Sequence, residues 1–111
     1  MDTESALSAL SALAHSHRLA AYRALVQAGP SGLAVGELRE LLGLPAATLT
    51  SHLNQLRVAG LISDERQGRV IRMRADYLQM DALLAYLNEN CCAGAACLPT
   101  ANTINTTKRK C

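Results

Sequence analysis

The stretch that decides the fold runs from Leu33 to Arg74 and reads LAVGELRELLGLPAATLTSHLNQLRVAGLISDERQGRVIRMR. Apolar residues recur there every three or four positions in two blocks, from about Val35 to Leu42 and from just after Pro45 to about Ala59. A period near 3.6 predicts two amphipathic helices. Because only Gly43-Leu44-Pro45 separates them, the pair has the helix-turn-helix pattern. The side chains expected to face inward are Leu38, Leu41 and Leu42 on the first helix, and Leu49, Leu53, Leu56 and Ala59 on the second.

A hairpin is predicted directly after these helices. Gly60 ends the second helix, and Leu61–Asp64 and Val70–Arg74 read as strands around a turn that contains Gly68. In the second strand, apolar and charged residues alternate, which is typical of a half-buried strand.

Further helices are expected on both sides of this unit: residues 3–14 with Thr3 as cap, residues 16–28 with Ser16 as cap, and residues 76 to about 88 or 90. On the first we expect a stripe of Leu7, Leu10 and Ala14, widened by Ala6, Ala9 and Leu13. On the second we expect a buried face of Leu19, Tyr22, Leu25 and Val26. The last helix is apolar almost all round, which one small domain cannot bury, so the terminal helices are expected to form a dimer interface. The predicted fold is mainly α with a small β part: a winged helix-turn-helix of order α-α-α-α-β-β-α that dimerises through its terminal helices.

Length and composition limit the other possibilities. The 111 residues suit one domain, and we expect residues 1–90 to form it, residues 91–97 to form a cysteine segment, and residues 98–111 to be a disordered tail.

The net charge of +2 depends on Lys108, Arg109 and Lys110, without which eight arginines face nine acids. The start has acids where a signal peptide needs basic residues, and no apolar run is long enough for a membrane span, so a cytoplasmic protein is expected.

Two groups of side chains are suited to double-stranded DNA. Small hydroxyls, an amide and an imidazole on the second helix of the motif can enter a major groove, and hairpin arginines can reach the flanking backbone. The expected DNA contacts are Thr48, Thr50, Ser51, His52, Gln55, Arg66, Gln67 and Arg69. The alternative is a solvated helix face and a charged hairpin edge that resists aggregation.

Residues 33–74 resemble the ArsR/SmtB family of bacterial metal-responsive repressors. The resemblance rests on Leu33-x-x-x-Glu37-Leu38, on the segment from Thr48 to Leu61 with its Ser51-His52-Leu53-x-x-Leu56 core, and on Arg66-Gln67-Gly68-Arg69. It extends more weakly from about Leu7 to Leu87. It implies a homodimeric repressor, not an enzyme, that binds an inverted repeat in operator DNA and releases it when an inducer binds.

The cysteines suggest the inducer. The Cys-x-Cys-Asp motif of many arsenite-responsive relatives is missing, because residues 34–37 are Ala-Val-Gly-Glu, and the last helix lacks the ligand set of zinc-sensing relatives. What remains is Cys91, Cys92 and Cys97, which resembles arsenical-responsive members with ligands at the end of the dimerisation helix. Thiolates favour soft ions, and trivalent arsenic or antimony takes three of them. No role is predicted for Cys111.

The predicted function is therefore a repressor released by arsenite or antimonite at this three-cysteine site. Because Cys91 and Cys92 cannot both reach one ion from a regular helix, binding is expected to reshape the helix end and misalign the two recognition helices. The alternatives are a repressor that senses redox state or sulfur through a disulfide of the same thiols, thiols without function, or a winged helix that binds only protein. A thiol enzyme is disfavoured, since neither Cys-x5-Arg nor Cys-x-x-Cys occurs.

Overall fold

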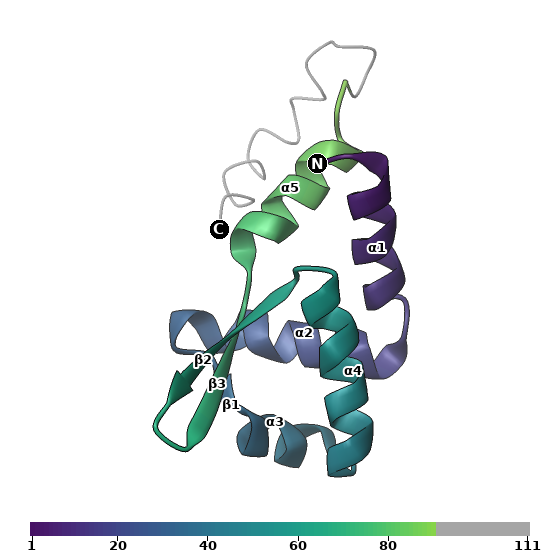
Figure 1. Ribbon diagram of the computed structural model, residues 1–111. Helices are drawn as coiled ribbons and strands as arrows, with labels where there is room; N and C mark the ends of the chain where they lie inside the picture. The colour runs from purple at the N-terminus through teal and green to yellow at the C-terminus, as the bar shows by residue number, and fades with distance from the viewer. Residues whose placement is uncertain (91–111) are drawn as a thin grey trace.

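The computed structural model describes residues 1–90, which fold into five helices and a three-stranded sheet (Figure 1). In chain order the elements are α1 (Thr3–Leu13), α2 (Ser16–Ala28), the short 3-10 turn η1 (Gly29–Ser31), β1 (Leu33–Ala34), α3 (Val35–Leu42), α4 (Ala46–Val58), β2 (Ile62–Gln67), β3 (Val70–Ala75) and α5 (Tyr77–Leu87). The strands are antiparallel in the order β1-β3-β2. This is a winged helix-turn-helix, so the predicted fold class is confirmed.

The predicted element order is wrong in one respect, because it lacks β1. Leu33 pairs with Met73 and Ala34 with Arg72, which joins the start of α3 to the edge of the hairpin. Two residues carry no periodic signal of their own, and their partners lie about forty positions away. Gly32 permits this approach: its φ is +66°, and a Cβ there would lie 2.2 Å from the carbonyl oxygen of Met73.

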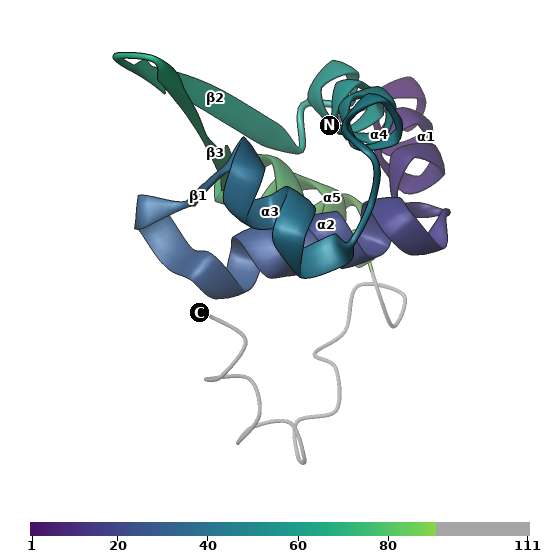
Figure 2. The ribbon, with the colours of Figure 1, turned by 90° about the horizontal axis from the view of Figure 1, so that it is seen from below.

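The hairpin extends further than its apolar residues predict. We expected the first strand to end at Asp64, yet β2 continues to Gln67, which pairs with Val70 across the turn. All of β2 after Ile62 is exposed, and in Figure 2 the hairpin extends away from the helices. Backbone pairing alone therefore continues the strand beyond the body of the domain. The turn needs Gly68, whose φ is +66°, since two-residue hairpin loops require positive φ.

The core lies where α2, α3, α4 and the base of the hairpin meet. Its fully buried large side chains are Leu25, Leu38, Leu49, Leu53, Leu56, Leu61, Met73 and Leu83. The expected inward face of α4 is confirmed, and Tyr22 and Leu25 are buried as expected on α2. The expectation is wrong for Leu41, which is 65% exposed, and for Leu19 and Val26, which are also exposed.

The first helix packs differently from its predicted stripe. Its buried residues are Ala6, Ala9 and Ala12, whereas Leu7 and Leu10 point to solvent. Small side chains allow α1 to approach the rest of the domain closely, and this leaves its leucines outside. The two predicted caps, those of α1 and α2, are each wrong by one residue.

The side chain of Asp2, not Thr3, accepts a hydrogen bond from the backbone of Ser5 at the start of α1. Hydrogen bonding to the side chain of Ser5, and then to its backbone, lowers the pKa of Asp2. The imidazole of His15, not Ser16, caps α2 by accepting from the backbone N–H of His17. Hydrogen-bond acceptors of several kinds serve as caps, and the residue just outside each helix has the extended backbone that the role requires.

Within residues 1–90, no helix is long and apolar enough to cross a membrane. The cysteine segment 91–97 and the tail 98–111, with all four cysteines, lie outside the described residues.

Candidate nucleic-acid interface

Helix α4 presents most of its predicted DNA contacts to solvent. Thr48, Thr50, Ser51 and Gln55 are all exposed, while His52 is half-buried on the flank of α4 that faces α2. The buried face with Leu49, Leu53 and Leu56 fixes this orientation, because it holds the opposite side of the helix against the core. The hydroxyls and the amide are thus free to meet base edges or phosphates.

Asn54 is a polar residue of this surface that the sequence reasoning missed. It lies three positions after Ser51, so the two share the outward face of α4. Its amide is exposed, and its oxygen accepts a hydrogen bond of 2.6 Å from Arg57 Nη1. The oriented amide is suited to a base edge, since Asn reads adenine by paired hydrogen bonds. The helical spacing from Ser51 alone would have identified it.

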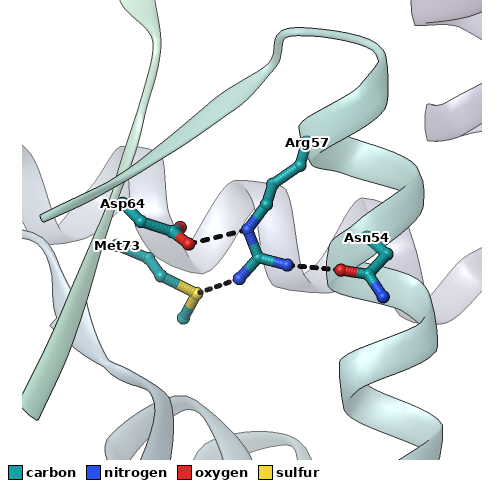
Figure 3. Close-up of polar contacts among 4 residues, drawn as sticks. All are labelled: Asn54, Arg57, Asp64 and Met73. Atoms are coloured by element: carbon teal, nitrogen blue, oxygen red, sulfur yellow. Dashed lines mark hydrogen bonds and ion pairs between the residues drawn. The ribbon is translucent and has the colours of Figure 1, made fainter. Parts of the chain in front are cut away.

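Arg57 holds the wing against α4 (Figure 3). Its Nε pairs with Asp64 Oδ2 of β2 at 2.8 Å, its Nη1 donates to Asn54, and its Nη2 lies 3.9 Å from the sulfur of Met73 on β3. One guanidinium thus contacts three elements and ties α4 to both strands of the hairpin.

The four hairpin arginines divide into two pairs. Arg72 donates to the carbonyls of Ser31 and Gly32, and Arg74 Nε donates to Pro30 O at 2.6 Å, so both fasten β3 to the turn after α2. Each also has a carboxylate partner, Glu37 for Arg72 and Glu65 for Arg74.

Arg66 and Arg69 lie at the tip of the hairpin, exposed together with Gln67. Neither arginine has an ion-pair partner within residues 1–90. A charge without a carboxylate partner is suited to a phosphate backbone, and the role of these two residues as DNA contacts stays a prediction.

A concavity of about 810 Å³ lies between α3, α4 and the wing. Glu37 and Glu40 line its α3 side, and Thr50, Arg57 and Arg69 line the side of α4 and the hairpin. Carboxylates repel phosphate, so a DNA backbone is attracted to the α4 and hairpin side only.

His52 has unexpected neighbours. Its Nδ1 lies 3.4 Å from Nη1 of Arg18, and its ring centroid lies 4.5 Å from that of His15 and 5.4 Å from that of His17. Partial burial, and then the charges of His15, Arg18 and His17, lower the pKa of His52. The imidazole therefore favours its neutral form, which can either donate or accept a hydrogen bond.

The predicted inducer residues Cys91, Cys92 and Cys97 lie outside the described residues, so the structure does not place them. Many arsenite-responsive relatives have cysteines at the positions of residues 34–37, of which Ala34 ends β1 and the other three form the first turn of α3. The backbone N–H of Ala34 donates there to the Glu37 carboxylate at 2.8 Å, and these four positions carry no thiol.

Comparison with known proteins agrees with this architecture. A family model described as a helix-turn-helix domain matches residues 13–65. NolR from Sinorhizobium fredii is 34% identical over 84% of this chain and 88% of its own, with a TM-score of 0.62. An ArsR family transcriptional regulator is 27% identical over 81% of this chain and 90% of its own, with a TM-score of 0.69. HlyU from Vibrio cholerae is 26% identical over 83% of this chain and 99% of its own, with a TM-score of 0.65. No curated protein sequence matches significantly.

Fold and surface together define a winged helix-turn-helix protein with an exposed polar face on α4 and, among residues 1–90, two arginines without ion-pair partners at the tip of its wing. The chain belongs to the ArsR family of DNA-binding transcriptional regulators, which are not enzymes.

Proposed function

We propose that this protein is a cytoplasmic homodimeric repressor. It binds an inverted repeat in operator DNA through α4 and the wing, and it releases the DNA when trivalent arsenic or antimony binds Cys91, Cys92 and Cys97. The observation that carries the DNA part is the exposed polar face of α4 together with Arg66 and Arg69 at the tip of the wing, which have no ion-pair partner among the described residues.

The reading surface can be tested with the DNA upstream of the protein's own coding sequence. The double variant Ser51→Ala/Gln55→Ala should bind the operator more weakly in fluorescence anisotropy, by roughly 1–3 kcal/mol for each base that the two side chains recognise. Gln27→Ala, exposed at the end of α2, is the matched control and should bind like the wild type. Wild-type affinity in the double variant would exclude α4 as the reading helix.

Exposed apolar residues on the terminal helices support the dimer. On α5, Leu78 is 81% exposed, Leu84 49% and Leu87 53%, and on α1 Leu7 is 60% exposed. The start of α1 lies beside the end of α5 (Figure 1), where Thr3 Oγ1 and Tyr86 Oη hydrogen-bond at 2.6 Å. A solved protein from Mycobacterium bovis with the same fold is described as homodimeric.

The dimer interface is tested by Leu78→Asp. The side chain is mostly exposed within the chain, so the variant should fold but sediment as a monomer and bind the operator weakly. Leu41→Asp is the matched control, because Leu41 is similarly exposed on α3, away from the terminal helices. Equal dimerisation of both variants would contradict an α1–α5 interface.

The inducer assignment rests on the sequence. Three thiols lie within residues 91–97 of the sequence, shortly after α5 ends at Leu87. Three thiolates complete the pyramidal coordination of an As(III) or Sb(III) ion. Operator release should be titrated with arsenite, antimonite, zinc and cadmium. A coupling of about 1–3 kcal/mol would weaken operator binding some 5- to 150-fold.

The variant Cys91→Ser/Cys92→Ser/Cys97→Ser should bind the operator normally and ignore arsenite. Release of that variant by arsenite would disprove the assignment, and Cys111→Ser is the matched control for a thiol outside the cluster.

A redox-sensing repressor is the second candidate. HlyU, a relative of this chain, has a solved structure described as reduced, and cysteines close in sequence can form a disulfide. Operator release by peroxide or polysulfide, reversed by dithiothreitol, together with no response to arsenite, would favour this function over metalloid sensing.

A further inference from the structure

Three histidines from distant parts of the sequence converge beside the reading helix. His15 caps α2, His17 lies in the first turn of α2, and His52 projects from the flank of α4. One ring nitrogen of each lies within 4.8 Å of those of the other two. They are the only histidines in the chain, and among residues 1–90 they form the one group of potential metal ligands with this spacing.

We propose that His15, His17 and His52 form a binding site for a borderline divalent transition-metal ion, with Zn²⁺ as the representative. Three imidazoles with an open fourth position is a common zinc donor set, and Zn–N bonds of 2.0–2.1 Å place tetrahedral ligand nitrogens about 3.4 Å apart. Because the nitrogens lie within 4.8 Å of one another, they must approach by at most about 1.4 Å. His15 and His17 are exposed, so their side chains can make this adjustment once the cap contact of His15 Nδ1 is released. The donor set contains no oxygen, which disfavours Mg²⁺ and Ca²⁺.

Two existing contacts of these histidines compete with the metal, and replacing them is the structural change that metal binding causes. His15 Nδ1 accepts the backbone N–H of His17, and Arg18 lies at 3.4 Å from His52 Nδ1. Arg18 is itself fixed by Ala12 O, to which its Nε donates at 2.6 Å. A bound ion replaces these weaker contacts with bonds that tie the start of α2 to α4. Because such a tie exists only in the folded chain, metal binding stabilises the fold.

The site is separate in sequence from the C-terminal thiols, so the proposal does not depend on metalloid sensing. To isolate it, all four cysteines are replaced by Ser in the full-length, tag-free protein. Titration with Co²⁺ should then give d–d absorption bands without the intense near-ultraviolet bands of thiolate ligation, with one ion per chain. Zn²⁺ should displace the Co²⁺, and Zn²⁺ should raise the melting temperature.

Single variants in the cysteine-free background identify the ligands. His17→Gln and His52→Gln should each weaken Zn²⁺ binding by at least about 10-fold, since even the removal of an outer-sphere partner has an effect of this size. His15→Asn keeps a good helix cap and should weaken binding to the same extent. Ser16→Ala, an exposed neighbour without a ligand atom, is the matched control and should bind like its parent.

Arg18→Gln should tighten binding, because it removes a positive charge next to the ion. The proposal is overturned if the cysteine-free protein binds no Co²⁺ or Zn²⁺, or if binding survives His52→Gln unchanged. Each variant's far-ultraviolet circular dichroism, measured without metal, shows whether weaker binding reflects a failure to fold.

Discussion

Gly32→Ala is the substitution for which the structure gives the sharpest expectation. Gly32 has φ of +66°, and its missing Cβ would lie 2.2 Å from Met73 O, 2.9 Å from Arg74 Cγ and 3.0 Å from Met73 C. Together with a ψ of −164°, this φ is a backbone conformation essentially limited to glycine, and it costs a residue with a Cβ about 1–3 kcal/mol. The close contacts also force β1 and β3 apart, and overpacking of this kind costs about 1–3 kcal/mol more. The sum, about 2–6 kcal/mol, is a large part of the roughly 5–15 kcal/mol that typically stabilises a small protein.

Gly29→Ala separates the two contributions. Gly29 has nearly the same backbone conformation as Gly32 (φ +78° and ψ −164° against +66° and −164°), but nothing lies within 4 Å of its would-be Cβ. This variant should be destabilised only by the backbone part, about 1–3 kcal/mol. Urea unfolding of both variants and the wild type, at one protein concentration because dimers unfold in a concentration-dependent way, measures the difference. Equal destabilisation at the two positions would show that the close approach of β1 to β3 does not limit residue 32.

Three further outcomes are expected. Arg69→Gln should reduce the slope of log K against log salt for operator binding by about 1. Arg74 is bonded to the turn after α2, so Arg74→Gln should mainly lower the melting temperature. Equal salt slopes for Arg69→Gln and the wild type would contradict a phosphate contact at the wing tip. Arg57→Met should lower operator affinity more than the removal of one charge does, because it frees the wing from α4, and salt dependence of binding separates the two effects. Burial raises the pKa of Tyr22 to about 12 from 10.0, so the unfolded chain ionises first and wild-type stability should fall by up to about 3 kcal/mol between pH 10 and 12. Tyr22→Phe should lack this fall, and it should lower the free energy of unfolding little at pH 8, since the buried hydroxyl has no partner within residues 1–90. A parallel fall in stability in both proteins would refute the assignment to Tyr22.

Local pattern was enough to identify the helices and the hairpin. The spacing of Leu49, Leu53 and Leu56 oriented α4 correctly, and Gly43 and Gly60 marked helix ends. These signals are local, because helix periodicity and turn chemistry depend on residues a few positions apart. The exposed hydroxyls of α4 followed from the same periodicity, so most of the candidate DNA surface was predictable.

Apolar periodicity alone could not decide which side of α1 faces the core. The sequence offers both a leucine stripe and an alanine stripe, and the structure buries Ala6, Ala9 and Ala12. The choice depends on how closely α1 approaches its neighbours, which is a property of the packed domain. It leaves Leu7 and Leu10 exposed, available for a second subunit.

The sequence by itself determined the class of fold, the orientation of α4 and the position of the thiols along the chain. Only the tertiary structure decided that Arg57 joins α4 to the wing, that Arg72 and Arg74 fasten the hairpin to the turn after α2, and that β1 joins the sheet. It alone brings His52 to two histidines some 35 residues earlier. The physical reason is the same in each case. Such contacts join segments far apart in the chain, and the local periodicity of a sequence does not specify which distant segments pack against each other.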